Sequence, residues 1–400
     1  MSRSDALASR DDDGLREDER EVYDRQLRVW GVETQTKIRR ARVCVAMSRE
    51  SESESESESE SESHGRGHGR DDDANANASD GNEKATKRRR TSRPRAITHG
   101  LAAETLKNIV LAGAGEVTIR DDGCWASART IGTNGNFLNC RVATTQAPVT
   151  NETSMNDGQS VDVTLAQAMA RTLREMNPFA SIAVDDGGRE RALEDEDEEY
   201  FKKFDVVVAC GYDCASAKAI DGKCRAVKCG FFVARASAAS GSFFVDLGDA
   251  FAYVGAGTGK TKEGEDATPK TETATFCAFT DAVRSDWSDI GKRASRIPAA
   301  MTVIWDFENR AKRSPTEKDF DSLRADANAS AVARGKPANF ISDDALRVLL
   351  KPVEEVPAIN AIVGGVLAQE VLKAVSHKGA PCVNFFVFDA LSGQGVTQRL

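Results

Sequence analysis

A charged motif near the N-terminus is the first candidate for chemistry in this sequence. Arg25 stands in the sequence Tyr-Asp-Arg-Gln at positions 23–26, and Arg28 follows three residues later. A guanidinium group is permanently charged and can donate two parallel hydrogen bonds to phosphate oxygens. The alternative is that both arginines pair with nearby acids on an N-terminal helix. Spacing alone favours that simple pairing, so the interpretation depends on what the rest of the chain resembles.

A strand, a turn, a helix and a second strand must position any such site. Residues 42–46 (RVCVA) are a short apolar run typical of a buried strand, and residues 101–111 carry apolar side chains at helical spacing. Residues 116–120 (EVTIR) predict a second strand that ends at Asp121. This order is the dinucleotide-binding βαβ pattern, in which a phosphate rests at the helix N-terminus beside Gly100. For Asp121 a cap or turn role is favoured over a ribose contact.

Strand and helix patterns alternate along the rest of the chain, which predicts a parallel α/β sheet. The segment 276–350 loses the strand pattern and becomes helical and polar, as in a smaller lobe. The expected strands are 181–184, 204–210, 231–235 and 384–388, and the expected helices are 163–176, 217–227 and 359–376.

Composition limits the classes of protein that the chain can belong to. It has 400 residues, 40% hydrophobic and 29% charged, with a net charge of -9, which gives no global attraction to nucleic acid or anionic lipid. No signal peptide is expected, and no uninterrupted apolar run reaches the roughly 18 residues of a membrane span, so we expect a soluble intracellular protein. The nine cysteines and four histidines lack zinc-site spacing. We expect reduced, buried thiols, none of them a nucleophile.

The segment 48–98 stands apart from its surroundings. It contains a Ser-Glu repeat and no aromatic residue, so it cannot bury enough apolar surface to offset its chain entropy, and we expect disorder. Its basic stretch 84–95 is either a nuclear import signal or a solvated charge run. Residues 49–98 are either a true insertion or an unspliced intron read as coding sequence, and the sequence leaves both choices open.

Five segments of the chain form a recognisable set: 23–31 (YDRQLRVWG), 107–113 (KNIVLAG), 177–178 (NP), 276–288 (FCAFTDAVRSDWS) and 357–376 (PAINAIVGGVLAQEVLKAVS). Together they resemble the small, Aos-type subunit of the SUMO-activating enzyme, a ubiquitin-like activating enzyme. The resemblance implies a Rossmann-like, ThiF/MoeB-type adenylation domain with a parallel-rich sheet.

The same resemblance divides the chain into parts. It implies an inactive adenylation domain whose first part comprises 21–47 and 99–260 and whose last part is 351–400. Residues 1–20 are expected to be a disordered N-terminus, 48–98 a disordered insertion in the first βα turn, and 261–350 a smaller, mostly helical lobe.

The resemblance also implies that this chain is the inactive half of a pair. Active relatives have Arg-Gln-Phe-Leu where this sequence has 135–138 (GNFL), and Leu165 falls near the position of their nucleotide-contacting lysine. Asp213 is present but is followed by a cysteine where they have asparagine. Gly100, Asp121 and Asp213 are therefore expected to be vestigial. No metal site is expected, and ATP and Mg would be bound by the partner subunit.

The implied function is a non-catalytic subunit that completes the adenylation site of the large subunit of a heterodimeric SUMO-activating enzyme, with Arg25 acting in trans like an arginine finger. SUMO would be adenylated at its C-terminus before thioester transfer. Neither nucleic acid nor a membrane is an expected partner, and the expected location is the nucleus, with or without the cytoplasm. The SUMO paralogue, and SUMO against another ubiquitin-like modifier, stay open. The alternatives are a self-sufficient MoeB/ThiF-like adenylyltransferase and an inactive nuclear scaffold.

Overall fold

The computed structural model describes residues 15–48, 99–121, 125–127, 160–237, 239–255, 270–284, 286–287, 290, 295–311, 313–350, 356–390 and 392–399. The expected insertion beyond Ser48, its basic stretch 84–95 and the sequence 135–138 lie outside these described residues.

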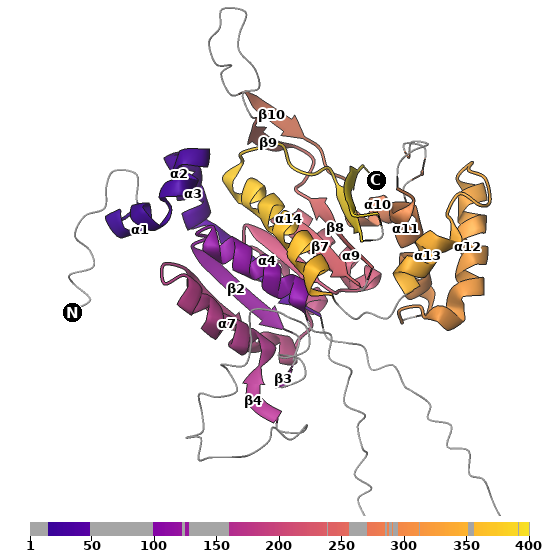
Figure 1. Ribbon diagram of the computed structural model, residues 1–400, viewed down its shortest axis with the longest axis horizontal. Helices are drawn as coiled ribbons and strands as arrows, with labels where there is room; N and C mark the ends of the chain where they lie inside the picture. The colour runs from indigo at the N-terminus through magenta and orange to yellow at the C-terminus, as the bar shows by residue number, and fades with distance from the viewer. Residues whose placement is uncertain are drawn as a thin grey trace, which may run out of the picture. The chain divides into compact units, whose positions relative to one another are not determined.

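A mostly parallel sheet of eight strands forms the centre of the fold (Figure 1). Its order is β12-β11-β8-β7-β6-β1-β2-β5, and the five strands from β7 to β5 run parallel to one another. Two small antiparallel pairs, β3 with β4 and β9 with β10, lie outside it. The strand bounds are β1 Arg42–Met47, β2 Glu116–Asp121, β3 Trp125–Ser127, β4 Ser160–Thr164, β5 Ser181–Asp185, β6 Val206–Cys210, β7 Gly230–Ala236, β8 Ser240–Asp246, β9 Phe251–Val254, β10 Thr271–Ala274, β11 Phe385–Asp389 and β12 Gln394–Gln398.

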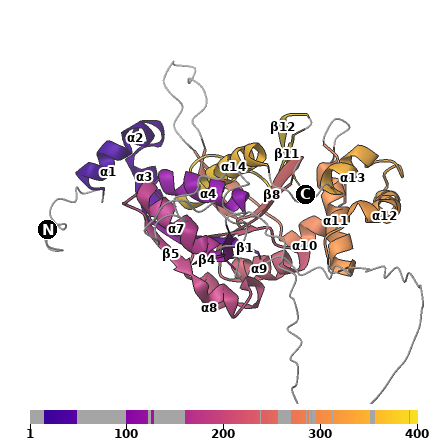
Figure 2. The same ribbon diagram turned by 60° about the horizontal axis from the view of Figure 1, so that its bottom comes forward.

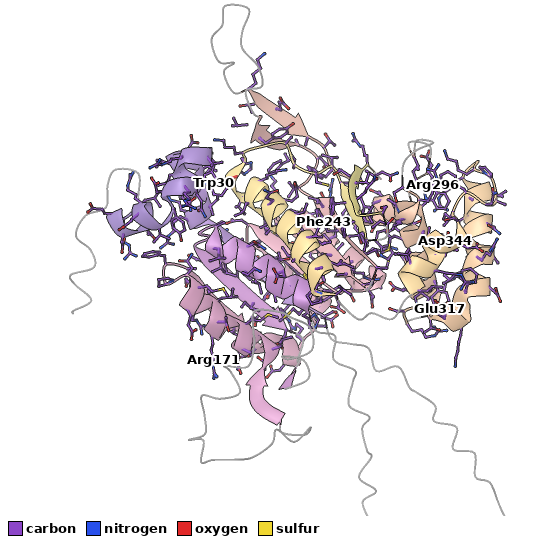
Figure 3. All side chains as sticks on the ribbon, in the orientation of Figure 1. Trp30, Arg171, Phe243, Arg296, Glu317 and Asp344 are labelled. Carbon is purple, nitrogen blue, oxygen red and sulfur yellow. The ribbon has the colours of Figure 1, made fainter. Side chains whose placement is uncertain are left out.

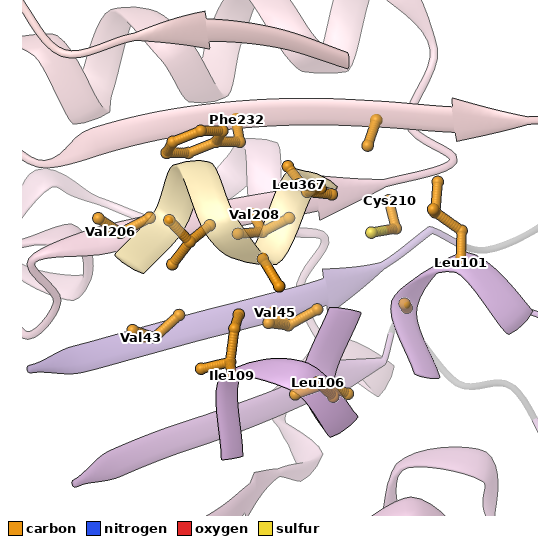
Figure 4. Packing of buried hydrophobic residues seen from close by; sticks show 14 of the residues in the cluster. Val43, Val45, Leu101, Leu106, Ile109, Val206, Val208, Cys210, Phe232 and Leu367 are labelled. Atoms are coloured by element: carbon orange, nitrogen blue, oxygen red, sulfur yellow. The ribbon is translucent and has the colours of Figure 1, made fainter. Parts of the chain in front are cut away.

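Helices cover both faces of this sheet because successive side chains of a strand point to opposite sides. Val43 and Val45 of β1 belong to a hydrophobic cluster with the helices α4 Gly100–Leu111, α7 Leu165–Met176 and α14 Pro357–Ser376 (Figure 4). Cys44 and Ala46 of the same strand belong to a second cluster with α8 Glu198–Phe201, α9 Cys214–Ala226 and α10 Phe279–Arg284. Figure 2 shows α8 and α9 on the opposite side of the sheet from α4 and α14.

The helix α14 is the one described helix whose length and composition would allow it to cross a membrane. In this fold Val363, Leu367 and Val371 are buried in the cluster that covers the sheet. Gly364 lets the helix lie so close to α4 that a Cβ atom there would be 2.8 Å from Cβ of Glu104. The helix is therefore a core element of the α/β fold.

A third hydrophobic cluster forms within residues 261–350. It joins α11 Ile297–Ala311, α12 Phe320–Ala333 and α13 Asp343–Leu350 around the buried Trp287. Trp305 of α11 belongs to the cluster under the sheet instead, which ties these helices to the main fold. Three short 3-10 helices complete the described elements, at Asp186–Arg189, Leu193–Asp195 and Glu317–Asp319.

The expectation of a disordered N-terminus over residues 1–20 is wrong for its last residues. Leu15 is buried, and the helix α1 spans Glu17–Val22. Three acids in its first turn complement the helix dipole, and the buried Glu19 is paired with Nε of Arg39 at 2.8 Å. The helices α2 Asp24–Trp30 and α3 Val32–Arg40 follow.

The expected α/β fold class is confirmed, and the differences concern local boundaries and antiparallel strands. The helix expected from 163 begins at Leu165, because Thr164 caps it by accepting a hydrogen bond from N of Gln167 at 3.1 Å. Sequence patterns did not predict β8 or β12, which pair antiparallel with β7 and β11.

Candidate functional site

The helix α2, which carries Arg25, is fixed to the fold at its first turn. Tyr23 precedes the helix and is buried, and its hydroxyl accepts a hydrogen bond from Nδ2 of Asn177 at 2.8 Å. The same Nδ2 donates to the carbonyl of Val110 at 2.6 Å. Burial raises the pKa of the Tyr23 hydroxyl, so it stays neutral. A Cβ atom at Gly113 would lie 2.9 Å from the Tyr23 ring. Three motifs that are far apart in the sequence thus meet at one point.

Further contacts hold the rest of α2 against the end of α4. Nε2 of Gln26 donates to the carbonyl of Leu111 at 3.2 Å. Nε1 of Trp30, labelled in Figure 3, donates to Oε1 of Gln35 at 2.9 Å, and Gln35 in turn donates to the carbonyl of Ala112 at 2.9 Å. The backbone on both sides of Arg25 is therefore held in place by hydrogen bonds.

The two arginines of the motif have different environments. Arg28 is paired with Asp24 one turn away, at 2.9 Å. Arg25 is exposed, and within the described part of the chain its side chain makes no ion pair or hydrogen bond. The break at Tyr23 explains this difference, since α1 ends at Val22 and Glu21 is not on the same helix as Arg25. Pairing with local acids, the simpler alternative, accounts for Arg28 and not for Arg25.

The second candidate region is the edge of the sheet where the parallel strands β1, β2 and β6 end. Here His99 directly precedes α4 in the left-handed conformation, with φ 45°, and its side chain makes no capping hydrogen bond. Gly100 is the first residue of that helix. The His99 side chain is buried and bonds to the Ser48 backbone. Burial lowers its pKa to about 4, so the imidazole is neutral near pH 7. A neutral, buried ring therefore occupies the start of the helix, where a phosphate site would need free amides and positive charge.

Asp121 contributes to helix capping at the same edge. Its Oδ2 accepts a hydrogen bond from N of Ala166 at 3.0 Å, in the first turn of α7. Leu165, which the resemblance implied to be near a lysine position, is the first residue of that helix and is buried. The cap role favoured for Asp121 by the sequence is the one that the structure shows.

Asp213 also acts as a helix cap. Its Oδ1 accepts a hydrogen bond from N of Ser216 at 2.8 Å at the start of α9. The next residue, Cys214, is buried beside Lys218, and burial raises the pKa of its thiol. Arg235, whose charge interacts with Asp213 and Cys214, forms two hydrogen bonds to Glu308, of 2.9 and 3.0 Å. Each of these charged groups is thus engaged within the chain.

Four of the described cysteines are poor nucleophiles because burial raises the pKa of their thiols. Burial raises the pKa of Cys44 and of Cys382 to about 12, and it also raises the pKa of Cys214 and Cys277. A thiol with a raised pKa carries little thiolate near pH 7. No group of three or more His, Cys, Asp or Glu side chains in the described residues could hold a metal ion.

Comparison with known proteins identifies the family. The model of the ThiF family matches residues 157–400, more than half of the chain. A SUMO-activating enzyme subunit 1B-1 from Arabidopsis thaliana is 30% identical over 396 residues, which covers 98% of both chains. The chain belongs to the ThiF family. Other relatives are subunit 1A from the same plant, 29% identical over 98% of both chains, and SUMO-activating enzyme subunit 1 from Homo sapiens, 24% identical over 97% and 96%.

Membership of the ThiF family confirms the resemblance drawn from the five segments. The site residues that the sequence pointed to separate into two groups. Gly100, Asp121 and Asp213 lie at the strand ends, whereas Arg25 lies on α2 beside the opposite end of α4. Sequence reasoning missed His99, for which the only signal was a histidine directly before the first residue of a predicted helix.

Proposed function

We propose that this ThiF family member is the small, non-catalytic subunit of a heterodimeric SUMO-activating enzyme. Its relatives are named as subunit 1 of that enzyme, and such a name implies at least one further subunit. In this proposal the large subunit binds ATP and Mg, SUMO binds through the complex, and the complex works in the nucleus. The small subunit contributes Arg25 to the adenylation site of its partner.

The observation that carries the proposal is the unpaired, exposed Arg25 on a helix that is otherwise anchored. Val22 and Val29 lie close to it in sequence and are 63% and 79% exposed, although apolar side chains gain free energy when a partner covers them. An arginine projecting from such a surface can donate a bidentate pair of hydrogen bonds to a phosphate held by another chain. The backbone on both sides of Arg25 is already held by hydrogen bonds, which reduces the entropy lost when that contact forms.

The strand-end edge of this chain supports the non-catalytic part of the proposal. A nucleotide needs free donors for its phosphates, and the described residues at this edge do not offer them. His99 is neutral and buried, Asp121 and Asp213 cap helices, and Arg235 is bonded to Glu308. These contacts of the described residues support placing ATP on the partner, and the proposal places no reaction step in this chain.

Substituting alanine for Arg25 tests the role of its side chain. The heterodimer with Arg25→Ala should assemble normally and should lose at least roughly tenfold in SUMO-dependent ATP–pyrophosphate exchange, which is about 1.4 kcal/mol of barrier. Arg28→Ala is the matched control, since Arg28 lies on the same helix and is paired with Asp24. A heterodimer that assembles with Arg25→Ala and keeps its full exchange rate would refute the role in trans.

The isolated chain separates the alternatives. A self-sufficient MoeB/ThiF-like enzyme would catalyse pyrophosphate exchange with SUMO and ATP in the absence of the large subunit, whereas our proposal predicts no exchange. An inactive scaffold would bind the large subunit, if at all, without restoring adenylation. Exchange that appears only on mixing the two subunits supports the proposed heterodimer.

A further inference from the structure

A cavity of about 540 Å³ opens at the edge of the sheet opposite to the strand ends described above. Its lining includes the first residues of three neighbouring strands, which are Arg42 of β1, Val206 of β6 and Gly230 of β7. We call it the basal cavity. Its volume lies within the range of roughly 300 to 1,000 Å³ in which proteins hold ligands.

The basal cavity is basic although the whole chain is acidic. Five Lys or Arg residues line the cavity, whereas Asp205 is its one lining acid. The five cations are Lys37, Arg40, Arg42, Lys202 and Lys228. Arg42 is paired with Asp205, Nη2 to Oδ1, at 2.7 Å. Arg40 and Lys228 are exposed, and neither side chain forms an ion pair or hydrogen bond within the described residues. These two cations are available to a ligand.

Backbone strain at the same place is a second, independent observation. Of the described non-glycine residues only three have positive φ, and two of them, Lys228 at 60° and His377 at 55°, line the basal cavity. Both follow the end of a helix, where glycine adopts this conformation without cost. The ring of His377 is stacked on Phe251 at 4.7 Å and bonds to the carbonyl of Ala252 at 2.8 Å. A strained position held by a charged or ring side chain is typical of functional sites.

Helix ends alone do not account for this charge. The helices α3, α9 and α14 end at this cavity, and each C-terminus is equivalent to about half a negative charge, which offsets only part of a formal excess of four positive charges. Lys37 and Lys202 also pair with Glu33 and Glu199 outside the cavity. Those acids are 85% and 74% exposed, and such surface pairs are weak and screened by salt.

The walls of the cavity indicate the chemistry of the ligand. The cavity also has an apolar lining, formed by Phe204, Leu247, Phe251 and Val375. The cations are spread over several elements, with Lys37 and Arg40 on α3 and Arg42 on β1. The helices present carbonyl ends here, not the amide ends that hold compact phosphates. Distributed charges around apolar walls fit a ligand that spreads its negative charge over several groups. We propose that the basal cavity binds an extended acidic peptide segment of a partner protein, with its carboxylates on Arg40 and Lys228 and an apolar side chain against Phe251 and Leu247.

Fluorescence anisotropy with the full chain tests this proposal. The probe is a fluorescein-labelled peptide, Asp-Glu-Leu-Phe-Glu-Asp, and its neutral counterpart is Asn-Gln-Leu-Phe-Gln-Asn. The double variant Arg40→Gln with Lys228→Asn should weaken binding of the acidic probe at least tenfold. Asparagine tolerates the left-handed conformation, so this variant should remain folded, as an unchanged or raised Tm would show. Arg171→Gln is the control, because Arg171 is exposed on α7 and does not line the cavity (Figure 3).

Each outcome decides the question. Loss of binding in the double variant but not in Arg171→Gln, with no binding of the neutral peptide, supports the site. Equal loss in Arg171→Gln, or no loss in the folded double variant, overturns it and leaves the cations as partners of the helix ends. Displacement of the probe by inorganic tripolyphosphate at least as effectively as by unlabelled acidic peptide also overturns it, because the ligand would then be a compact anion.

Discussion

Replacing Asp221 by asparagine should stabilise the protein, increasingly so as the pH rises. Asp221 lies on α9 and is 1% exposed. Its Oδ2 accepts a hydrogen bond at 2.7 Å from N of Phe279, which is the first residue of α10. Its Oδ1 has no donor among the described residues. Asp246 is also buried, and both of its carboxylate oxygens accept hydrogen bonds from Nη1 of Arg225, Oδ1 at 2.7 Å and Oδ2 at 2.5 Å. Burial, together with the charge of Asp246, raises the pKa of Asp221 to about 8.

The raised pKa sets the direction and size of the effect. Below about pH 4 the carboxyl of Asp221 is protonated in both the folded and the unfolded chain, so it contributes no pH dependence. Between about pH 4 and 8 only the unfolded chain loses the proton, and the free energy of unfolding falls by up to 1.36 kcal/mol per pH unit. At pH 8 the cost has an upper bound of about 5 kcal/mol. Well above pH 8 both states are ionised and the cost is constant.

Asparagine at position 221 can keep the hydrogen bond from Phe279 without a titrating proton. Its amide oxygen can accept from Phe279, and its NH₂ can donate to Asp246 in place of the acid proton. We expect Asp221→Asn to gain at least about 1 kcal/mol in the free energy of unfolding at pH 8 relative to its difference from the parent at pH 5. Urea unfolding between pH 5 and 8.5 measures this. Asp213→Asn is the control, because asparagine also caps helices well and Asp213 is exposed. A difference that does not grow with pH would refute the reasoning.

Two further substitutions test packing and buried charge. Arg120→Met should lower the free energy of unfolding by about 3–5 kcal/mol, because Arg120 is 0% exposed and pairs with Asp185 and Glu196, which would lose this buried cation. Urea unfolding measures the loss, and parental stability would contradict the prediction. Gly364→Ala should cost about 1–3 kcal/mol through its clash with α4. The Tm of each variant measures the effect, and the control Gly365→Ala should be neutral or stabilising because its Cβ meets nothing within 4 Å. An equal loss of Tm in both variants would count against close packing at position 364.

The parallel half of the sheet could be predicted from the sequence because its strands are continuous apolar runs. Residues 206–210 (VVVAC) are buried throughout, as expected for a strand covered on both faces. The antiparallel strands could not be predicted in this way. The strand β8 contains Ser240, Gly241 and Ser242, which have weak strand preference, and yet all its residues are buried between β7 and β11. Tertiary pairing overrides the local preference there. The strand β12 is a polar edge strand, whose composition is typical of a loop.

The candidate site could be predicted only in part, again because some of its features depend on tertiary contacts. The motif around Arg25 could be found by its residue types, and pairing between Arg28 and Asp24 follows from helical spacing. The isolation of Arg25 depends on the helix break at Tyr23, and Tyr23 is held at that break by its hydrogen bond to Asn177, 154 residues away. Contacts over such separations are not visible in a local pattern.

Arg25 differs from its neighbours in the motif in what it contributes to this chain. Tyr23 and Gln26 stabilise this chain directly, through hydrogen bonds to Asn177 and Leu111. The Arg25 side chain makes no such hydrogen bond within the described residues. The entropy that this side chain would lose on becoming ordered is therefore not offset within the described part of the chain. If the motif served only stability, replacing Arg25 would be neutral while replacing Tyr23 would be costly. If it serves a partner, the same Arg25 replacement leaves stability unchanged and lowers the activity of the complex, so stability and exchange rate measured on one variant distinguish the two roles.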